Sequence, residues 1–126
     1  MNIFNTETIP LMKSALSAYT MRQSVTANNI ANVTTPGYQR QEVVFEEKLQ
    51  EAVSKLSPTK SEHNFIDGSQ IQPEIVLDSN TALVNGINNV DIDQEMAGEG
   101  NAIKYQAVVQ ALVLKYRIVS DAIRGR

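Results

Sequence analysis

The segment Ala27-Asn-Asn-Ile-Ala-Asn-Val-Thr-Thr-Pro-Gly-Tyr38 lies where helical apolar spacing gives way to a turn. Short amide side chains compete for backbone hydrogen bonds, so Asn28, Asn29 and Asn32 are unfavourable inside a helix unless other groups use them. Two interpretations are open: a solvated helix end with Asn32 near its C-cap, or hydrogen bonds to neighbouring subunits. The second interpretation indicates packing or assembly rather than catalysis.

A long N-terminal helix is predicted to end within this segment. Between about Thr8 and Asn32, apolar residues recur at the three- and four-residue spacing of one helical face. Thr35 precedes Pro36, which disfavours the helical conformation at Thr35. Pro36 and Gly37 suit the two central positions of a type II turn, because glycine accepts the positive φ that the second position requires.

A second long helix is predicted near the C-terminus. Asp91, with Gln94 three residues later, forms a reasonable capping pair at its start. Gly98 and Gly100 each cost about 1 kcal/mol relative to alanine inside a helix, so fraying or a kink is expected there. Beyond them, residues at spacings of four and three form a coiled-coil-like seam: Tyr105, Val109, Leu112, Tyr116, Val119 and Ile123. A second apolar stripe widens this face: Ile103, Ala107, Leu114, Ile118 and Ala122.

The sequence between the two long helices is less regular. Phe45 and Leu49 lie on one apolar helical face, so a short amphipathic helix is expected over about residues 44–56. Prolines, glycines and asparagines interrupt residues 57–88, which are expected to be irregular and mobile. Within them, residues 71–77 predict a short extended segment at the edge of a sheet.

These elements predict one mainly α-helical domain over residues 1–126. Its parts would be an N-terminal helix at 1–33, a turn and short helix at 34–56, a flexible middle at 57–88 and a C-terminal helix at 89–126. The two long helices bury their apolar faces best if they pair antiparallel as a coiled-coil-like bundle. Both faces are too wide for one partner, which indicates further contacts with copies or relatives of the chain.

The composition excludes several functional classes. A net charge of −3 and an isoelectric point near 5.1 argue against nucleic acid as a partner. The absence of cysteine excludes disulfides, thiolate metal sites and a cysteine nucleophile. His63 has no surrounding set of metal ligands, and no nucleophile–base arrangement is present. We therefore expect no enzyme activity, cofactor, metal or small-molecule substrate, and we find neither a secretory signal nor a transmembrane segment.

The asparagine segment resembles the signature of the flagellar basal-body rod family. That signature, Asn-Asn-Ile-Ala-Asn-x-x-Thr-Pro-Gly-Tyr, matches Asn28, Asn29, Ile30, Ala31, Asn32, Thr35, Pro36, Gly37 and Tyr38. Val33 and Thr34 stand where the family often has Ala-Asn. Residues 40–49, 88–96 and 104–112 also resemble the family, and most of all its proximal rod subunit. The resemblance covers the two terminal thirds of the chain.

This resemblance implies a structural subunit of the bacterial flagellum. Such a subunit is made in the cytoplasm, exported by the flagellar type III apparatus, and polymerised through its terminal helices into the drive-shaft rod needed for motility. Its partners would be further copies, other rod subunits, proteins at the junction with the membrane ring, and the export gate. Its place would be the periplasm-spanning rod of the basal body, where the nine signature residues would pack against neighbouring subunits.

The segment Phe45-Glu-Glu-Lys-Leu49 resembles the element that the export gate recognises in such subunits. The alternative interpretation is a hydrophobic pair that covers the core, and both roles can hold, one before folding and one after. For the whole chain, the alternative functions are a cytosolic helical export chaperone or adaptor, or another short rod subunit of the same family.

Overall fold

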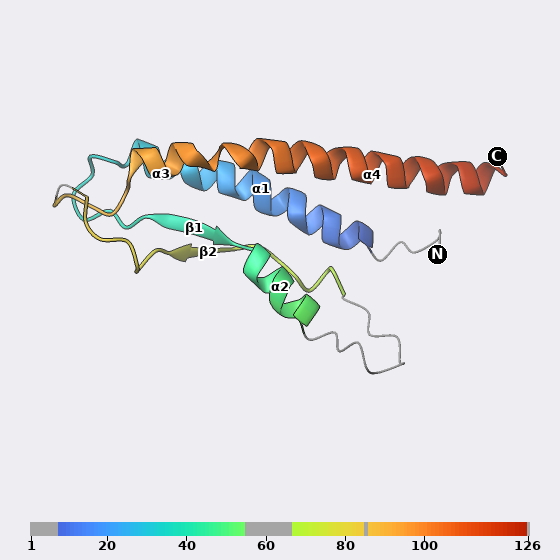
Figure 1. Cartoon of the computed structure of the whole chain (residues 1–126), viewed down its shortest axis with the longest axis horizontal. Coiled ribbons are helices and arrows are strands. Elements are labelled where there is room, and N and C mark those ends of the chain that lie inside the picture. The colour runs from blue at the N-terminus through green and yellow to red at the C-terminus, as the bar shows by residue number, and fades with distance from the viewer. Residues whose placement is uncertain (1–7, 55–66, 85, 126) are drawn as a thin grey trace.

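The computed structural model describes residues 8–54, 67–84 and 86–125. Its elements are, in order, α1 (Thr8–Ala31), β1 (Gln41–Val44), α2 (Glu46–Ser54), β2 (Glu74–Leu77), α3 (Ile92–Met96), the 3-10 turn η1 (Ala97–Glu99) and α4 (Gly100–Arg124). The predicted mainly helical architecture, with long helices at both ends, is confirmed (Figure 1). His63 and residues 57–66 of the predicted mobile middle lie outside the described residues.

The end of α1 is fixed by the asparagine segment. The carbonyl of Asn28 accepts both from the backbone N–H of Asn32 at 3.1 Å and from the side-chain Nδ2 of Asn32 at 2.8 Å. The backbone N–H of Tyr38 then donates to the carbonyl of Thr35 at 3.3 Å. Gly37 has a φ of 73°, so the chain makes the predicted type II turn, and this position favours glycine.

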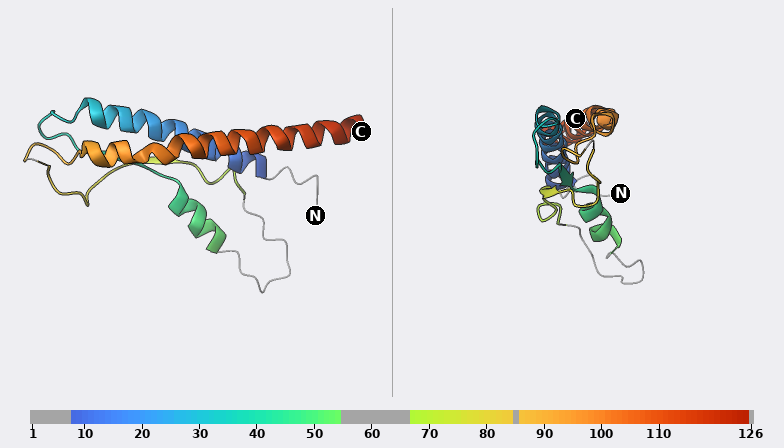
Figure 2. Two further views of the ribbon diagram at one scale, coloured as in Figure 1. Left: turned by 45° about the horizontal axis from the view of Figure 1, so that its top comes forward. Right: turned by 90° about the vertical axis from the view of Figure 1, so that its left-hand side faces the viewer.

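The helices α1 and α4 run antiparallel and side by side (Figures 1 and 2). Asn101 at the start of α4 donates from Nδ2 to the carbonyl of Tyr19 in α1 at 2.9 Å. α4 is the longer partner, and its C-terminal part extends beyond the Thr8 end of α1 (Figure 1). None of the side chains described in α4 is fully buried, although Val108 packs partly against the core.

A two-stranded antiparallel sheet lies along α1, with β1 the strand nearer to that helix (Figure 1). Its register pairs Gln41 with Leu77 and Val44 with Glu74. β2 falls within the extended segment predicted at 71–77, after Pro73. β1 is a correction: residues 34–56 contain the expected turn and short helix, but this strand lies between them. Its four residues are too few for their alternation to stand out from the helical spacing that follows.

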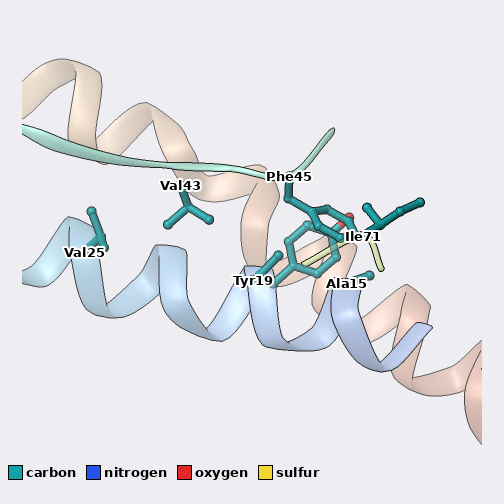
Figure 3. Packing of buried hydrophobic residues seen from close by; sticks show 7 residues of the cluster. Ala15, Tyr19, Val25, Val43, Phe45 and Ile71 are labelled. Atoms are coloured by element: carbon teal, nitrogen blue, oxygen red, sulfur yellow. The ribbon is translucent and has the colours of Figure 1, made fainter. Parts of the chain in front are cut away.

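The core forms between α1 and the segments that cross it. Buried apolar side chains from α1, β1, the residue between β1 and α2, and the loop before β2 make one cluster, shown in Figure 3: Ala15, Ala18, Tyr19, Val25, Val43, Phe45 and Ile71. Gly68 brings that loop against α1, because a Cβ atom there would lie 2.6 Å from the Cβ of Leu11. Ser14 Oγ donates to the Gly68 carbonyl at 3.3 Å and holds the same approach.

The C-terminal helix is divided near its start. Asp91 caps α3 as predicted, since its carboxylate accepts from the backbone N–H of Asp93 at 2.9 Å. The C-terminal helix predicted over residues 89–126, with fraying or a kink at its glycines, is α3 followed by η1 and then α4. The change occurs at Gly98 and Gly100, where the low helix propensity of glycine predicted a kink.

Candidate functional site

The asparagine segment contributes one side chain to the interior, and that is Asn29. It is completely buried and faces the outer edge of β1. Its Oδ1 accepts from the backbone N–H of Gln41 at 3.0 Å, while its Nδ2 donates to the carbonyl of Gln41 at 2.8 Å. The amide of Asn29 thereby supplies the same pair of hydrogen bonds that a neighbouring strand would supply.

Two further hydrogen bonds join Asn29 to distant parts of the chain. Tyr38 donates its hydroxyl to Asn29 Oδ1 at 2.9 Å, and Asn29 Nδ2 donates to Glu95 Oε2 at 3.1 Å. An amide has two donor hydrogens and two acceptor lone pairs, so these four bonds use its whole capacity. The structure therefore adds a third interpretation to the two offered by the sequence: the amide of Asn29 is bonded within its own chain.

Beside this amide lies a buried group of charges centred on Arg40. Its guanidinium pairs with Glu95, with Asp78 at 3.0 Å and with the more exposed Glu42 at 3.3 Å. The side chains of Glu95 and Asp78 are 2% and 4% exposed. Buried carboxylates require such compensation, because leaving water costs each of them several kcal/mol. Arg40 thus joins α3 to the end of β2.

Asp78 is held as a carboxylate by the turn that follows β2. The hydroxyl of Thr81 is the largest cause that lowers its pKa to about 2, followed by the backbone N–H groups of Asn80 and Thr81 and then by Arg40. Those two N–H groups lie 2.8 and 3.1 Å from Asp78 Oδ1. Asp78 is therefore charged at neutral pH, as the ion pair with Arg40 requires.

Two neighbouring asparagines complete this polar framework. Asn88 Nδ2 is shared among the carbonyls of Asn32, Val33 and Thr35 at 2.9, 3.0 and 2.9 Å, so it caps the chain just after α1. Asn89 accepts from the backbone N–H of Arg40 at 2.6 Å and donates to the carbonyl of Asp78 at 2.9 Å. Asn89 therefore bridges the two strands where their ladder ends. Sequence reasoning did not single out these asparagines or Arg40, and it interpreted Glu95 only as an acidic residue at the start of a helix, although the family-like segments at 40–49 and 88–96 contain all four.

The remaining residues of the signature are less buried. Asn28, Thr35, Pro36 and Gly37 are exposed, Ile30 retains 38% of its accessible surface, and Ala31 is exposed as well. Asn32 and Tyr38 are half-buried. The signature therefore has an inward part that holds the fold together and an outward part on the surface. Contacts between this outward part and other subunits stay a prediction.

The predicted seam of α4 is divided in a similar way. Val109, Leu112 and Val119 are half-buried. Tyr105 and Tyr116 are 41% and 46% exposed, and Ile123, near the end of α4, is 80% exposed. In the second apolar stripe, Ile103, Leu114 and Ile118 are all exposed. Pairing with α1 therefore leaves much of the apolar surface of α4 uncovered.

Phe45 and Leu49, the pair predicted for recognition by the export gate, lie against the core. Phe45 is 1% exposed, and the half-buried Leu49 packs on the same cluster. The interpretation as a hydrophobic pair that covers the core therefore describes the folded chain. Any recognition of Phe45 by another protein requires a state in which this part of the chain is unfolded.

The described residues were compared with the requirements of a metal site, a ligand groove and a membrane span. Across residues 8–54, 67–84 and 86–125, no three His, Cys, Asp or Glu side chains gather in a metal-binding group. A groove of about 500 Å³ runs between α1 and α4, lined by Tyr19, Arg22, Glu95, Asn101 and Tyr105 among others. Arg22 in this groove is already paired with Glu46. Within the same described ranges, no helix has the length and apolarity needed to cross a bilayer.

A helical hairpin with a polar framework inside and a largely uncovered apolar helix outside defines a structural subunit built to assemble. The comparisons agree with this class. The family model described as "Flagella basal body rod protein" matches residues 12–39. The chain is 34% identical to the flagellar basal body rod protein FlgB of Bacillus subtilis (strain 168) over 121 residues, which is 94% of each chain. It is 38% identical to FlgB of Borrelia hermsii over 76% of this chain and 78% of the relative.

The chain belongs to the flagellar basal body rod protein family. It is a structural subunit located in the rod of the flagellar basal body. The family match at residues 12–39 covers most of α1 and the turn that follows it, and it includes the end of α1 at which Asn29 and Asn88 make their hydrogen bonds.

Proposed function

We propose that this chain forms the proximal part of the rod and polymerises through α1 and α4 after export by the flagellar type III apparatus. The observation that carries the proposal is the uncovered apolar surface of α4. Ile103 and Leu114 lie about three helical turns apart on one side of the helix, and Ile118 lies close to the same line. These side chains are 71%, 56% and 39% exposed, and a rod neighbour would bury them.

The partners of this surface would be further copies of the chain and other rod subunits. Proteins at the junction with the membrane ring would contact the ends of the same two helices, α1 and α4. Complete burial of one leucine or isoleucine side chain contributes about 1.5–3 kcal/mol. Several such side chains on each subunit would support polymerisation into a rod that transmits torque for motility.

The substitution Leu114→Asp tests this proposal. Because Leu114 is exposed, the free energy of unfolding of the isolated subunit should change by only about 0.5 kcal/mol. Incorporation into the rod should fall about 10- to 100-fold, since the buried leucine is replaced by a charge. The measurement is the amount of subunit in purified hook–basal bodies, relative to the amount exported, from cells that carry only the variant.

Leu114→Met is the matched control, because it keeps the volume and apolarity of the surface and should incorporate normally. Equal incorporation of Leu114→Asp and Leu114→Met would contradict assembly through this face. The same fractionation separates the alternative class: a cytosolic chaperone or adaptor would remain in the soluble fraction and be missing from hook–basal bodies even as the unaltered chain.

We also propose that Phe45 and Leu49 are recognised by the export gate before the chain folds. Phe45 is buried in the folded subunit, so the two roles are separated in time. Replacing both residues with alanine should reduce export severalfold. The readout is the ratio of exported to intracellular subunit. Export of the double variant at the unaltered level would remove the gate role and leave the pair to the core alone.

A further inference from the structure

The two outer edges of the sheet are treated differently by the fold. On the β1 side, α1 covers the edge with polar side chains. Asn29 bonds to both backbone groups of Gln41, and Arg22 donates to the carbonyl of Val43 at 3.2 Å. A strand cannot add at this edge, because α1 covers it and both backbone groups of Gln41 and the carbonyl of Val43 are already bonded.

The β2 side of the sheet is open. The backbone N–H of Asp78 donates to the carbonyl of Arg40 at 2.8 Å, so Asp78 faces inward. Because backbone groups alternate along an antiparallel strand, the register turns the N–H and C=O groups of Ile75 and Leu77 outward. Among the residues that the structure describes, these outward groups have no hydrogen-bond partner.

The strand also carries exposed apolar side chains. Ile75 and Leu77 are 46% and 56% exposed. The charge on β2 belongs to Glu74, whose carboxylate is engaged by Lys48 at 2.5 Å. Open edges are usually protected by charged side chains, bulges or a covering element, and here the shortness of the strand is the main protection.

We propose that the free edge of β2 pairs with an extended segment of an adjacent subunit in the assembled rod. This inference rests on the proposed function, because it needs a neighbour that other contacts already hold close. A four-residue strand buries far less than the about 1,200 Å² of a stable interface, so this edge does not hold two free molecules together. Between subunits already joined through α1 and α4, the local concentration is high and a short strand pairing suffices.

A proline at position 77 tests the edge directly. The N–H of Leu77 points away from β1, so Leu77→Pro keeps the β1–β2 ladder and removes one outward donor. We expect the denaturation midpoint of the purified subunit to stay near the unaltered value, and incorporation into hook–basal bodies to fall about tenfold. Leu77→Met, which keeps both the donor and an apolar side chain, should incorporate normally. Val76→Pro is the opposite control, because it removes an inward donor and should destabilise the isolated subunit.

A second measurement does not depend on the folding of a proline variant. The chain contains no cysteine, so Leu77→Cys is a unique thiol. Maleimide should label it freely in the purified subunit and at least about tenfold more slowly in intact hook–basal bodies. Equal labelling rates in a rod that contains the subunit would overturn the edge proposal while leaving the proposed function in place. A stable dimer of purified subunits that Leu77→Pro abolishes would overturn the edge proposal as well. It would show that the edge of β2 joins two free molecules and does not need subunits already held together in the rod.

Discussion

Replacing Asn29 with alanine should lower the free energy of unfolding by about 3–5 kcal/mol. The substitution removes four hydrogen bonds and leaves both backbone groups of Gln41, together with the Oε2 of Glu95, without their partner in the interior. Since small domains are stable by only about 5–15 kcal/mol, a loss of this size approaches the whole margin. Urea denaturation followed by circular dichroism measures it, and the midpoint should fall without a change in slope.

Asn28→Ala is the matched control for this prediction. Asn28 is the same residue type one position earlier, but it is exposed, and its replacement should cost no more than about 0.5 kcal/mol. In cells, Asn29→Ala should reduce rod assembly more than export. Equal denaturation midpoints for the two variants would show that the buried amide is not a support of the fold, and normal motility with a normal yield of basal bodies would contradict the effect on assembly.

The sequence predicted the helices of this protein because each helix carries its own signals. Between Thr8 and Ala31 the apolar spacing is long enough to be unambiguous, and Thr35-Pro36-Gly37 dictates where the chain must turn. Asp91 marks the start of α3 for a similar local reason: a carboxylate before a helix accepts a free N–H. Local chemistry decides these features, and no distant contact has to be known.

The polar framework was not predictable in the same way. Asn29 is hydrogen-bonded to Glu95, which lies 66 positions later in the sequence. Nothing in the sequence near Asn29 indicates which distant segment it contacts. β1 escaped prediction for a related reason, since its residues gain a strand conformation only by pairing with β2 and with the amide of Asn29. The asparagines were recognised as unfavourable in a helix, but their partners depend on tertiary structure.

The framework explains why family-like segments occur at both ends of the chain. Residues 28–41 supply Asn29 and Arg40, whereas residues 78–95 supply Asp78, Asn88 and Glu95. Each set also has bonds of its own, but the bonds of Asn29 and Arg40 to Glu95 and Asp78 require both. The framework therefore sets the angle at which α1 and α4 leave their common end, and with it the direction in which both helices present surfaces to neighbours.

Replacing Arg40 with methionine should cost about 3–5 kcal/mol, because it leaves Glu95 and Asp78 buried without their shared cation. Arg40→Lys should recover only part of this loss. An ammonium is a compact charge and does not reproduce the planar fork by which the guanidinium reaches both carboxylates. Arg117→Met on the exposed part of α4 is the control and should change the free energy of unfolding by less than about 0.5 kcal/mol.

The comparison between Arg40→Met and Leu114→Asp separates folding from assembly. Arg40→Met should lower the denaturation midpoint of the isolated subunit, and it should lose rod incorporation as a consequence of that instability. Leu114→Asp should lose incorporation while the isolated subunit unfolds at the same midpoint as the unaltered chain. If Arg40→Met were as stable as Arg117→Met, the buried charges would have found other partners, and the framework would not fix the geometry of the helix pair. If both variants lost stability equally, the exposed face of α4 would belong to the fold of the single chain rather than to its contacts in the rod.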